Sequence, residues 1–333
     1  MNHRRKLTLA LGAGALAASF PLRAQQPAAP AGKLWRIGHL SGSGEAASKA
    51  FIDAFREGMR AQGYTEGKTF VLEQRYADGK TERLPALAQE LIRLNPDLLL
   101  ASTTPGNLAA KAATSTIPIV MVLVADPVGA GIVQSLARPG GNITGITNIS
   151  AELGGKRLEF LKAMVPAAAN VAVLINPTDQ NAVLQMRYLE DGARRLGIKL
   201  DPILEVRSAG DLADAFDAAT RARAPAAIRT IDPLVFILRN QTVALASKHH
   251  LPIMYPTRED VEAGGLIAYG TNVTDQYRQA ATFVHKILRG AKPADLPVEQ
   301  PTRFELFING KTAKALGLKI PYTLLITAEK VIE

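Results

Sequence analysis

Hydroxyl-bearing side chains follow two short apolar runs of the chain that predict β-strands. Ser41, Gly42 and Ser43 come directly after the first run, and Thr103 and Thr104 come after the third. Hydroxyl groups, together with free backbone N–H groups at the start of a helix, bind anions such as a carboxylate. We therefore expect these five residues to contact a polar or anionic group of a ligand.

Each of these two loops also has a simpler interpretation. Gly42-Ser43-Gly44 is compatible with a plain tight turn, and it weakly resembles a dinucleotide-binding loop whose third glycine is replaced by Ala47. Thr103 or Thr104 could serve only as the N-cap of a helix that has Pro105 at its first position.

Carboxyl and amide side chains occupy other strand ends. Asp126 ends the run Ile117–Val124 and precedes Pro127, and Asp232 with Pro233 repeats this pattern in the second half of the chain. Asn176 also ends an apolar run. A carboxylate here could bind an ammonium group, and the alternative is that each side chain accepts backbone N–H bonds in its own turn.

Two tyrosines and one arginine complete the candidate contacts. Tyr255 and Tyr269 end predicted strands, where a ring face and a hydroxyl suit an apolar or aromatic ligand, although packing is the alternative. Arg229 also lies near a strand end, where it could bring positive charge to the site and favour an acidic ligand. Pairing with a carboxylate, or exposure to solvent, is the other possibility for Arg229.

Catalytic or metal-binding patterns are not evident. None of the five histidines shows metal-ligand spacing, and the adjacent pair His249-His250 ends a predicted helix, where cations suit the helix dipole. The chain has no nucleophile elbow and no Walker loop. We therefore expect no enzyme activity, no metal and no cofactor.

Strands and helices alternate twice along the chain. The first half predicts strands at 35–40, 69–76, 97–101, 117–124 and 143–147, and helices at 48–60, 84–94, 107–113 and 130–136. The second half predicts helices at 153–164, 181–196, 211–222 and 234–249, and strands at 170–175, 198–206, 226–230, 251–255 and 266–269. A strand at 303–309 and a helix at 311–316 follow. This alternation indicates an α/β protein of two similar doubly wound parallel-sheet lobes joined by a hinge, with a ligand cleft between facing strand ends.

The repeat also predicts how the chain divides. We expect one lobe from residues 33–147 plus about 273–305, and the other from 148–272 plus about 306–333. The C-terminal tail crosses back between lobes in this division, so each lobe is discontinuous.

Composition excludes several classes of protein. The chain has 333 residues, 47% of them hydrophobic, and no cysteine, which removes disulfides and thiolate chemistry. The formal net charge is +9, but four of these positive charges lie in the first 24 residues, which leaves +5 for the remainder. That excess is mild, and no nucleic-acid-binding motif accompanies it, so nucleic acid is not an expected partner.

The N-terminus has the pattern of a secretory signal peptide. A basic head at His3–Lys6 precedes an apolar run, Leu7–Phe20, and the small residue Ala24 suggests the cleavage position. We therefore predict a signal peptide at 1–24, a Pro/Ala linker at 25–32 and export to the periplasm. Arg4-Arg5 leaves both the general secretory and the twin-arginine routes open.

Seven segments resemble one family. They include the run STIPIV at 115–120 and the long match SLARPGGNITG at 135–145. The others are residues 126–129, 171–177, 262–266, 292–301 and 311–317. The chain from 33 onward thus resembles the substrate-binding proteins of ABC transporters, in the branch called the tryptophan or aromatic amino-acid (TrpX-like) type.

The resemblance implies a type I periplasmic-binding-protein fold with three crossings between lobes. It implies capture of a small amino acid-like ligand, aromatic in one alternative, and its delivery to a permease and an ATPase in the inner membrane. We expect the ligand carboxylate at the Ser and Thr hydroxyls, its ammonium at an Asp, and a monomeric protein. A periplasmic enzyme acting in the same cleft and a ligand-sensing receptor are the alternatives.

Overall fold

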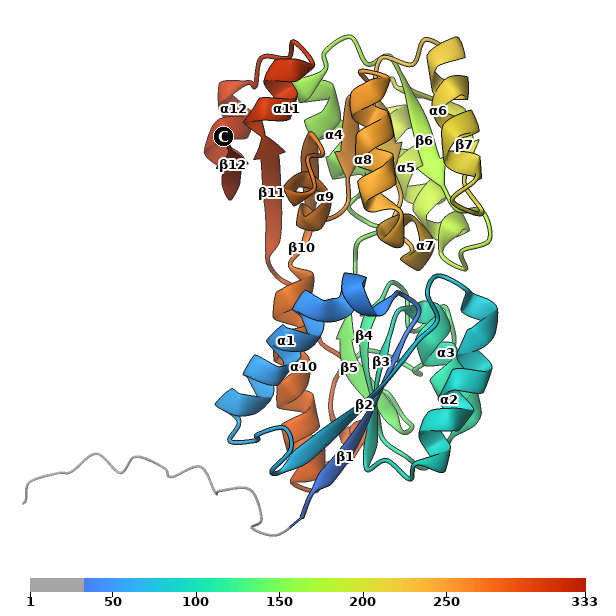
Figure 1. Ribbon diagram of the computed structural model, residues 1–333, viewed down its shortest axis with the longest axis vertical. Helices are drawn as coiled ribbons and strands as arrows, with labels where there is room; N and C mark the ends of the chain where they lie inside the picture. The colour runs from blue at the N-terminus through green and yellow to red at the C-terminus, as the bar shows by residue number, and fades with distance from the viewer. Residues whose placement is uncertain (1–32) are drawn as a thin grey trace, which may run out of the picture.

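The structure is a computed structural model that describes residues 33–333 as two α/β lobes stacked along the long axis of the molecule (Figure 1). The predicted signal peptide and linker lie outside the described residues. In residues 33–333 no helix is long and apolar enough to cross a membrane.

The first lobe is built on a sheet of five parallel strands in the order β2-β1-β3-β4-β5. Its strands are β1 (Trp35–Ser41), β2 (Phe70–Tyr76), β3 (Leu98–Ser102), β4 (Ile119–Val124) and β5 (Ile143–Thr147). Its helices are α1 (Glu45–Ala61), α2 (Leu84–Arg93), α3 (Thr104–Ala113) and, from later in the chain, α10 (Val273–Leu288). Strands β3, β4 and β5 are almost wholly buried, as expected of apolar strands covered by helices on both faces.

The second lobe has a seven-stranded sheet in the order β12-β11-β10-β9-β8-β6-β7. Its strands are β6 (Asn170–Ile175), β7 (Lys199–Glu205), β8 (Ala227–Arg229), β9 (Ile253–Tyr255), β10 (Ile267–Thr271), β11 (Phe304–Asn309) and β12 (Lys330–Ile332). Its helices are α4 (Gly154–Met164), α5 (Ala182–Leu196), α6 (Asp211–Arg221), α7 (Pro233–Ile237), α8 (Arg239–Lys248), α9 (Arg258–Glu262), α11 (Gly310–Ala315) and α12 (Tyr322–Thr327).

The two sheets share one topology. In each lobe the second strand in sequence lies at one edge, followed by the first, third, fourth and fifth. The second sheet then continues with β11, which is antiparallel to β10, and with β12, which is parallel to β11. In both lobes the carboxyl ends of the parallel strands face the other lobe. Ligands of doubly wound sheets bind at these strand ends.

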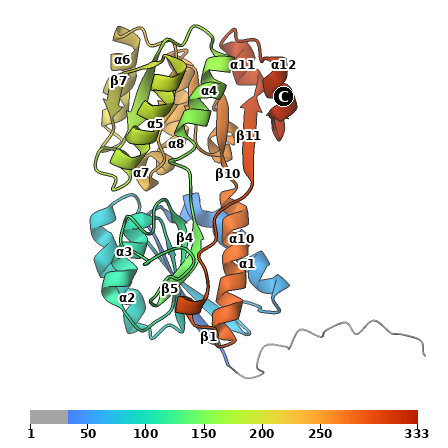
Figure 2. The ribbon, with the colours of Figure 1, turned by 180° about the vertical axis from the view of Figure 1, so that it is seen from behind.

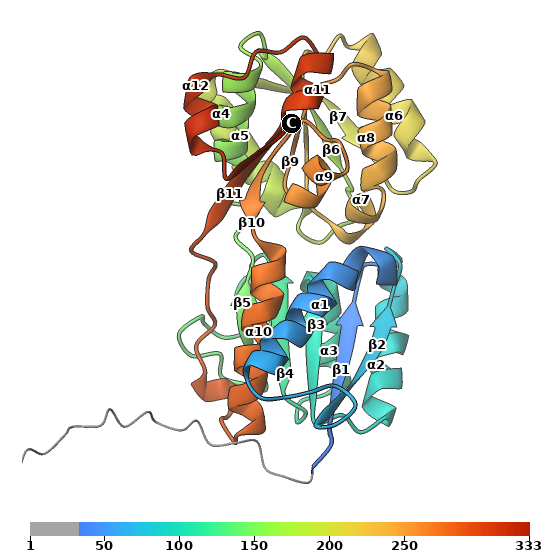
Figure 3. The same ribbon diagram turned by 60° about the vertical axis from the view of Figure 1, so that its left-hand side comes forward.

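Three segments connect the lobes (Figure 2). The first runs from β5 to α4, the second joins β10 to α10, and the third leads from Glu299 to β11. The first and third are paired, because Thr147 N donates to Glu299 O over 2.9 Å and Glu299 N donates to Gly145 O over 2.9 Å. Helix α10 lies closely on α1 (Figure 3), where a Cβ added at Gly58 would be 2.4 Å from the carbonyl oxygen of Arg278.

Two predicted helices differ from the structure. Residues 130–136 form turns and bends, because Gly131 adopts φ 67° and the N–H groups of Ile132 and Val133 both bond back to Pro127 O. The predicted helix 234–249 is split at Leu238 into α7 and α8. The sequence patterns also missed α9, α12 and β12.

Candidate ligand-binding site

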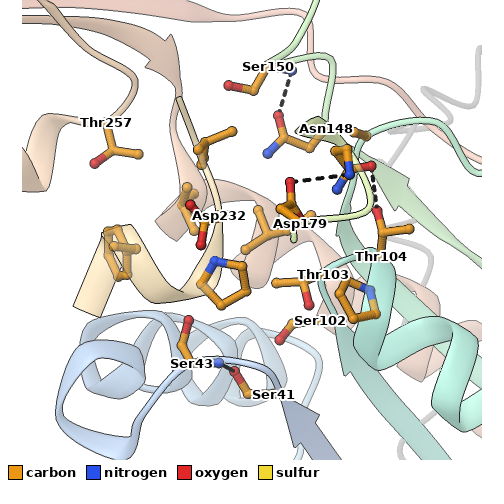
Figure 4. A pocket seen from close by; sticks show the side chains of 18 of the residues that line it. Ser41, Ser43, Ser102, Thr103, Thr104, Asn148, Ser150, Asp179, Asp232 and Thr257 are labelled. Atoms are coloured by element: carbon orange, nitrogen blue, oxygen red, sulfur yellow. Dashed lines mark hydrogen bonds between the residues drawn. The ribbon is translucent and has the colours of Figure 1, made fainter. Parts of the chain in front are cut away.

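A cavity of about 750 Å³, including its opening to solvent, lies between the facing strand ends of the two lobes. Both lobes and the crossing segments line it (Figure 4). Its lining residues fall into a hydroxyl-rich wall on the first lobe, an acidic wall on the second lobe and an aromatic end.

The hydroxyl wall follows β1 and β3. Ser41 is the last residue of β1 and Ser43 follows it. Ser102 is the last residue of β3, Thr103 follows it, and Thr104 begins α3. The adjoining helices, α1 and α3, begin here, and neither has a side chain capping its first turn. Hydroxyl groups and uncapped helix N-termini side by side form a surface that suits a carboxylate.

The backbone of this wall is strained. Thr103 has φ 66° and Leu123, at the end of β4, has φ 58°, and both residues line the cavity. Positive φ is uncommon for any residue other than glycine, and most of all for a β-branched one such as Thr103, and it costs on the order of 1–3 kcal/mol. The Thr103 Oγ1 atom is also buried without a hydrogen-bond partner. Strain together with an unpaired hydroxyl indicates that the fold holds Thr103 for a ligand.

The acidic wall consists of Asp179 and Asp232. Asp179 Oδ2 accepts bonds from Asn181 N at 3.2 Å and Gln185 Nε2 at 3.3 Å. Burial, and next the nearby carboxylate of Asp232, raise the pKa of Asp179 to about 7. Burial also raises the pKa of Asp232, whose Oδ2 atom is buried without a partner. Neither carboxyl group forms an ion pair within residues 33–333, although the charge of the buried Arg229 offsets part of the rise in the pKa of Asp232.

No lysine, arginine or histidine lines the cavity among the described residues, so Asp179 and Asp232 are its charged groups. A ligand that carries an ammonium group supplies the missing charge, whereas a purely anionic ligand meets two carboxylates. The hydroxyl wall, on the first lobe, offers neutral hydrogen-bond donors to a second group of the ligand that accepts hydrogen bonds.

Three aromatic side chains form an apolar end of the cavity. The Phe51 ring stacks on Tyr277 with a centroid distance of 5.6 Å, and it lies 5.8 Å from the Phe236 ring of the second lobe. Leu123 and Val273 extend this apolar surface. Aromatic faces at these separations suit a flat apolar or aromatic group of a ligand.

The crossing segments supply the remaining polar contacts. Asn148 and Ser150, between β5 and α4, line the cavity, and Ser150 N donates to Asn148 Oδ1 over 2.8 Å. Arg157 of α4 supports this segment from behind, because it donates to Ser150 O, to Ser150 Oγ and to Tyr269 O. A ligand held by Ser150 therefore contacts a segment that connects the two lobes.

Five of the ten predicted contacts line the cavity. These are Ser41, Ser43, Thr103, Thr104 and Asp232. Gly42 lies between two of them, and a Cβ added there would be 3.2 Å from both Thr103 Oγ1 and Pro233 Cγ. The missing side chain at Gly42 leaves room for Pro233 of the other lobe to lie close to it.

The other four predicted contacts lie elsewhere, and we correct their roles. Asp126 borders a separate hollow near the crossings, and its Oδ1 accepts the Gly129 N–H at 2.8 Å, which is the turn role. Asn176 lies at the mouth of the cleft and donates to Asp232 Oδ1 over 3.3 Å, so it positions Asp232.

Both tyrosines pack inside the second lobe. Tyr255 is fully buried and borders a hollow beside α8 and α11, away from the cavity. Tyr269 packs edge-on against Phe160 with a centroid distance of 4.9 Å. Arg229 is buried in an ion pair with Asp260 and does not line the cavity, so it cannot contact a ligand there.

The predictions missed Asp179, Asn148, Ser150 and the aromatic end. Asp179 follows Asn176 by three residues. The search for polar residues at strand ends therefore indicated the right loop but the wrong side chain. Phe51 and Tyr277 have the spacing of ordinary core residues, and no sequence signal separates them from the core. Within residues 33–333 no group of three or more His, Cys, Asp or Glu side chains could hold a metal ion.

Comparisons with known proteins agree with this geometry. The family model described as ABC transporter substrate binding protein matches residues 43–332. The tyrosine-binding protein of Clostridioides difficile (strain R20291) is 28% identical over 283 residues, which is 82% of this chain and 77% of the relative.

Two solved structures are similar over most of the chain. A conserved domain protein from Vibrio cholerae has a TM-score of 0.84 and 29% identity, covering 90% of this chain and 100% of that one. A domain from Streptococcus pneumoniae in complex with L-Trp has a TM-score of 0.80 and 25% identity, covering 89% and 100%. The chain belongs to the family of ABC transporter substrate-binding proteins.

Proposed function

We propose that this protein is the exported solute-binding component of an ABC importer, and that it captures an aromatic amino acid between its two lobes. The observation that carries the proposal is the composition of the cavity: one wall of hydroxyls, one wall with two unpaired carboxyl groups, and an aromatic end. As a member of a substrate-binding family, the protein binds its ligand for transport and is not an enzyme.

Each part of an aromatic amino acid has a matching surface in the cavity. Its carboxylate suits the hydroxyls of Ser41, Ser43 and Thr103 and the uncapped start of α3. Its ammonium suits Asp232, whose Oδ2 atom has no other partner. Its side chain suits the aromatic end, where burial of a ring contributes most of the binding energy. Ligands that lack one of these groups leave a buried polar group unpaired and bind more weakly.

The relatives support an aromatic ligand. One is named a tyrosine-binding protein, and another is a complex with L-Trp. Their sequences are 28% and 25% identical to this chain, so the choice between tyrosine and tryptophan is left to experiment.

Export and delivery complete the proposal. The pattern of residues 1–24 supports a signal peptide and a periplasmic location, and family membership supports delivery to a permease and its ATPase. We propose a monomer whose lobes comprise 33–147 with about 273–305, and 148–272 with about 306–333. Ligand capture then occurs as these lobes close about the three crossings.

Thermal unfolding of the purified protein tests the ligand class. L-Trp, L-Tyr and L-Phe should each raise the melting temperature, and a ligand at a hundred times its Kd should add about 2.7 kcal/mol to the free energy of unfolding. Tyramine, which lacks the carboxylate, and phenylacetate, which lacks the ammonium, should give smaller shifts. If none of the aromatic amino acids shifts the transition, the proposed ligand class is wrong.

A further inference from the structure

Helix α7 lies on the side of the second lobe that faces the first lobe, and its Phe236 packs into the first lobe (Figures 1 and 3). It is anchored on its own lobe by Val235, whose side chain belongs to the core of that lobe. The Val235 carbonyl accepts a bond from Nη1 of the buried Arg229 over 2.6 Å. Arg229, which the sequence suggested as a cleft residue, therefore fixes α7 from behind.

The opposite face of α7 is apolar and touches the first lobe. Phe236 is 7% exposed and packs within the hydrophobic cluster of the first lobe, beside Phe51. Pro233 lies over Gly42, and Ile237 lies over Gly79, where an added Cβ would be 3.3 Å from Ile237 Cδ1. Glycine at both lobe-1 positions permits this approach. Burial of the α7 face favours the closed arrangement of the lobes with or without a ligand.

The acidic wall acts in the opposite direction. Asp232 immediately precedes α7, and its Oδ1 atom accepts the N–H groups of Leu234 at 2.8 Å and Val235 at 3.2 Å. Its Oδ2 atom is buried without a hydrogen-bond partner, and the half-buried Asp179 lines the cavity with it. Closing the cleft without a ligand removes water from both carboxyl groups, and neither has an ion-pair partner among residues 33–333, which is unfavourable. Opening the cleft returns them to solvent.

We propose that α7 is a latch, that is, a helix whose contact with the first lobe favours closure, and that the unpaired carboxylate of Asp232 opposes this closure. The lobes then close fully only when a ligand's cationic group binds Asp232 Oδ2. One oxygen of Asp232 holds the latch helix and the other holds the ligand, so a single side chain joins binding to closure. This proposal rests on the proposed function for the cationic group of the ligand. It adds that the unliganded protein is kept open by its own acidic wall, with Phe236 and Pro233 as the positioning residues.

The distance across the cleft mouth measures closure directly. The full chain has no cysteine, so Lys80→Cys and Ala209→Cys introduce two unique labelling positions. Both residues are exposed and border the mouth, one on each lobe. Pulsed electron paramagnetic resonance between spin labels at these positions reports the open and closed populations, first without any ligand and then with saturating L-Trp or L-Tyr.

Two variants test the α7 latch and the carboxylate of Asp232 separately. Asp232→Asn keeps a capping oxygen for α7 but removes the charge, so we expect the unliganded variant to shift towards the closed distance by about tenfold in population. Its affinity for L-Trp and L-Tyr should fall at least tenfold. Phe236→Ala removes the latch side chain, which also lines the aromatic end of the cavity, so the open distance should persist even at L-Trp or L-Tyr concentrations that saturate the variant in calorimetric titration.

Matched controls use the same substitutions elsewhere. Asp126→Asn alters a strand-end carboxylate outside the cavity, and Phe216→Ala alters a buried ring in the core of the second lobe. Neither should change the label distances. If unliganded Asp232→Asn stays as open as the unsubstituted protein, or if Phe236→Ala closes normally, the latch is disproved. The unliganded measurement does not depend on ligand identity, so failure of the aromatic amino acids to bind leaves this part of the test intact.

Discussion

Ser41 and Thr103 lie on the same side of the cavity because β1 and β3 are neighbours in a parallel sheet and end at the same edge. This rule, by which polar residues at strand ends meet at one edge of the sheet, placed five of the ten predicted residues in the cavity lining. The rule failed where the loop itself decides which side chain points inwards. Asn176 Oδ1 accepts the N–H and the hydroxyl of Thr178, and this turn carries Asp179 into the cavity instead. Such local hydrogen bonding has no distinctive sequence pattern.

Asp179 should make the stability of the unliganded protein depend on pH. Its folded-state pKa is raised from 3.8 to about 7, so the folded protein binds a proton that the unfolded chain releases. Stability should therefore fall as the pH rises from about 4 to about 7, by on the order of 1.4 kcal/mol per unit of pKa shift. Urea unfolding across this range measures the slope.

Substitution of Asp179 provides the comparison. Asp179→Asn cannot ionise, so its stability should vary less with pH than that of the unsubstituted protein, and above pH 7 it should be the more stable of the two. Asp126→Asn is the control, because that carboxylate lies outside the cavity. An Asp179→Asn variant that retains the full pH slope would contradict the assignment.

At the scale of elements, strands were predicted better than short helices. Buried strands such as β4 are continuous apolar runs, and this pattern is hard to mistake. The split between α7 and α8 was hidden, because Leu234, Val235 and Leu238 fit one helical stripe. Leu238 leaves helical geometry with ψ near 5°, and the new direction lets Phe236 reach the first lobe while Val235 stays in the second. The contact between lobes therefore decided the break, and no local sequence signal carries it.

Arg157 should be the residue by which α4 fixes the crossings. It is 3% exposed, and its guanidinium donates to two atoms of Ser150 in the first crossing and to Tyr269 O in the middle of β10. Arg157→Met leaves these buried acceptors unpaired, so we expect a loss of about 3 kcal/mol or more in the free energy of unfolding. Affinity for the ligand should fall as well, because Ser150 lines the cavity.

Denaturant unfolding and calorimetric titration measure the two effects. Lys156→Met is the control, since Lys156 is exposed and its surface contacts are with Glu159 and the Phe160 ring, not with the crossings. Arg157→Lys should recover part of the stability, because a lysine can reach fewer of the three acceptors. An Arg157→Met variant that keeps both stability and affinity would show that the crossings hold their geometry without this clamp.

At the scale of the whole molecule, the repeat of strands and helices was sufficient to predict two similar lobes. The shared strand order follows from alternating strands and helices with right-handed connections, which leave few other arrangements. The additional strands β11 and β12 could not be foreseen in this way. They belong to no repeat unit, and their place depends on where the tail meets the open edge at β10.

The two lobes should unfold more independently without ligand than with it. Each lobe has its own hydrophobic clusters. Between the lobes lie the three crossings, the α7 contact, the 3.3 Å bond between Thr104 and Asn181 and the 3.2 Å bond from Arg258 to Thr274. Calorimetry of the unliganded protein should therefore show a broad or double transition.

A bound amino acid contacts both walls of the cavity, so it dissociates only when the lobes separate. Its free energy of binding therefore stabilises both lobes together. Saturating L-Trp or L-Tyr should raise the lower transition more than the upper one and merge the two. Phe236→Ala, which loosens the contact between lobes, should widen the separation in the absence of ligand. A single sharp transition that the ligand moves without changing its width would mean that the lobes already unfold as one unit.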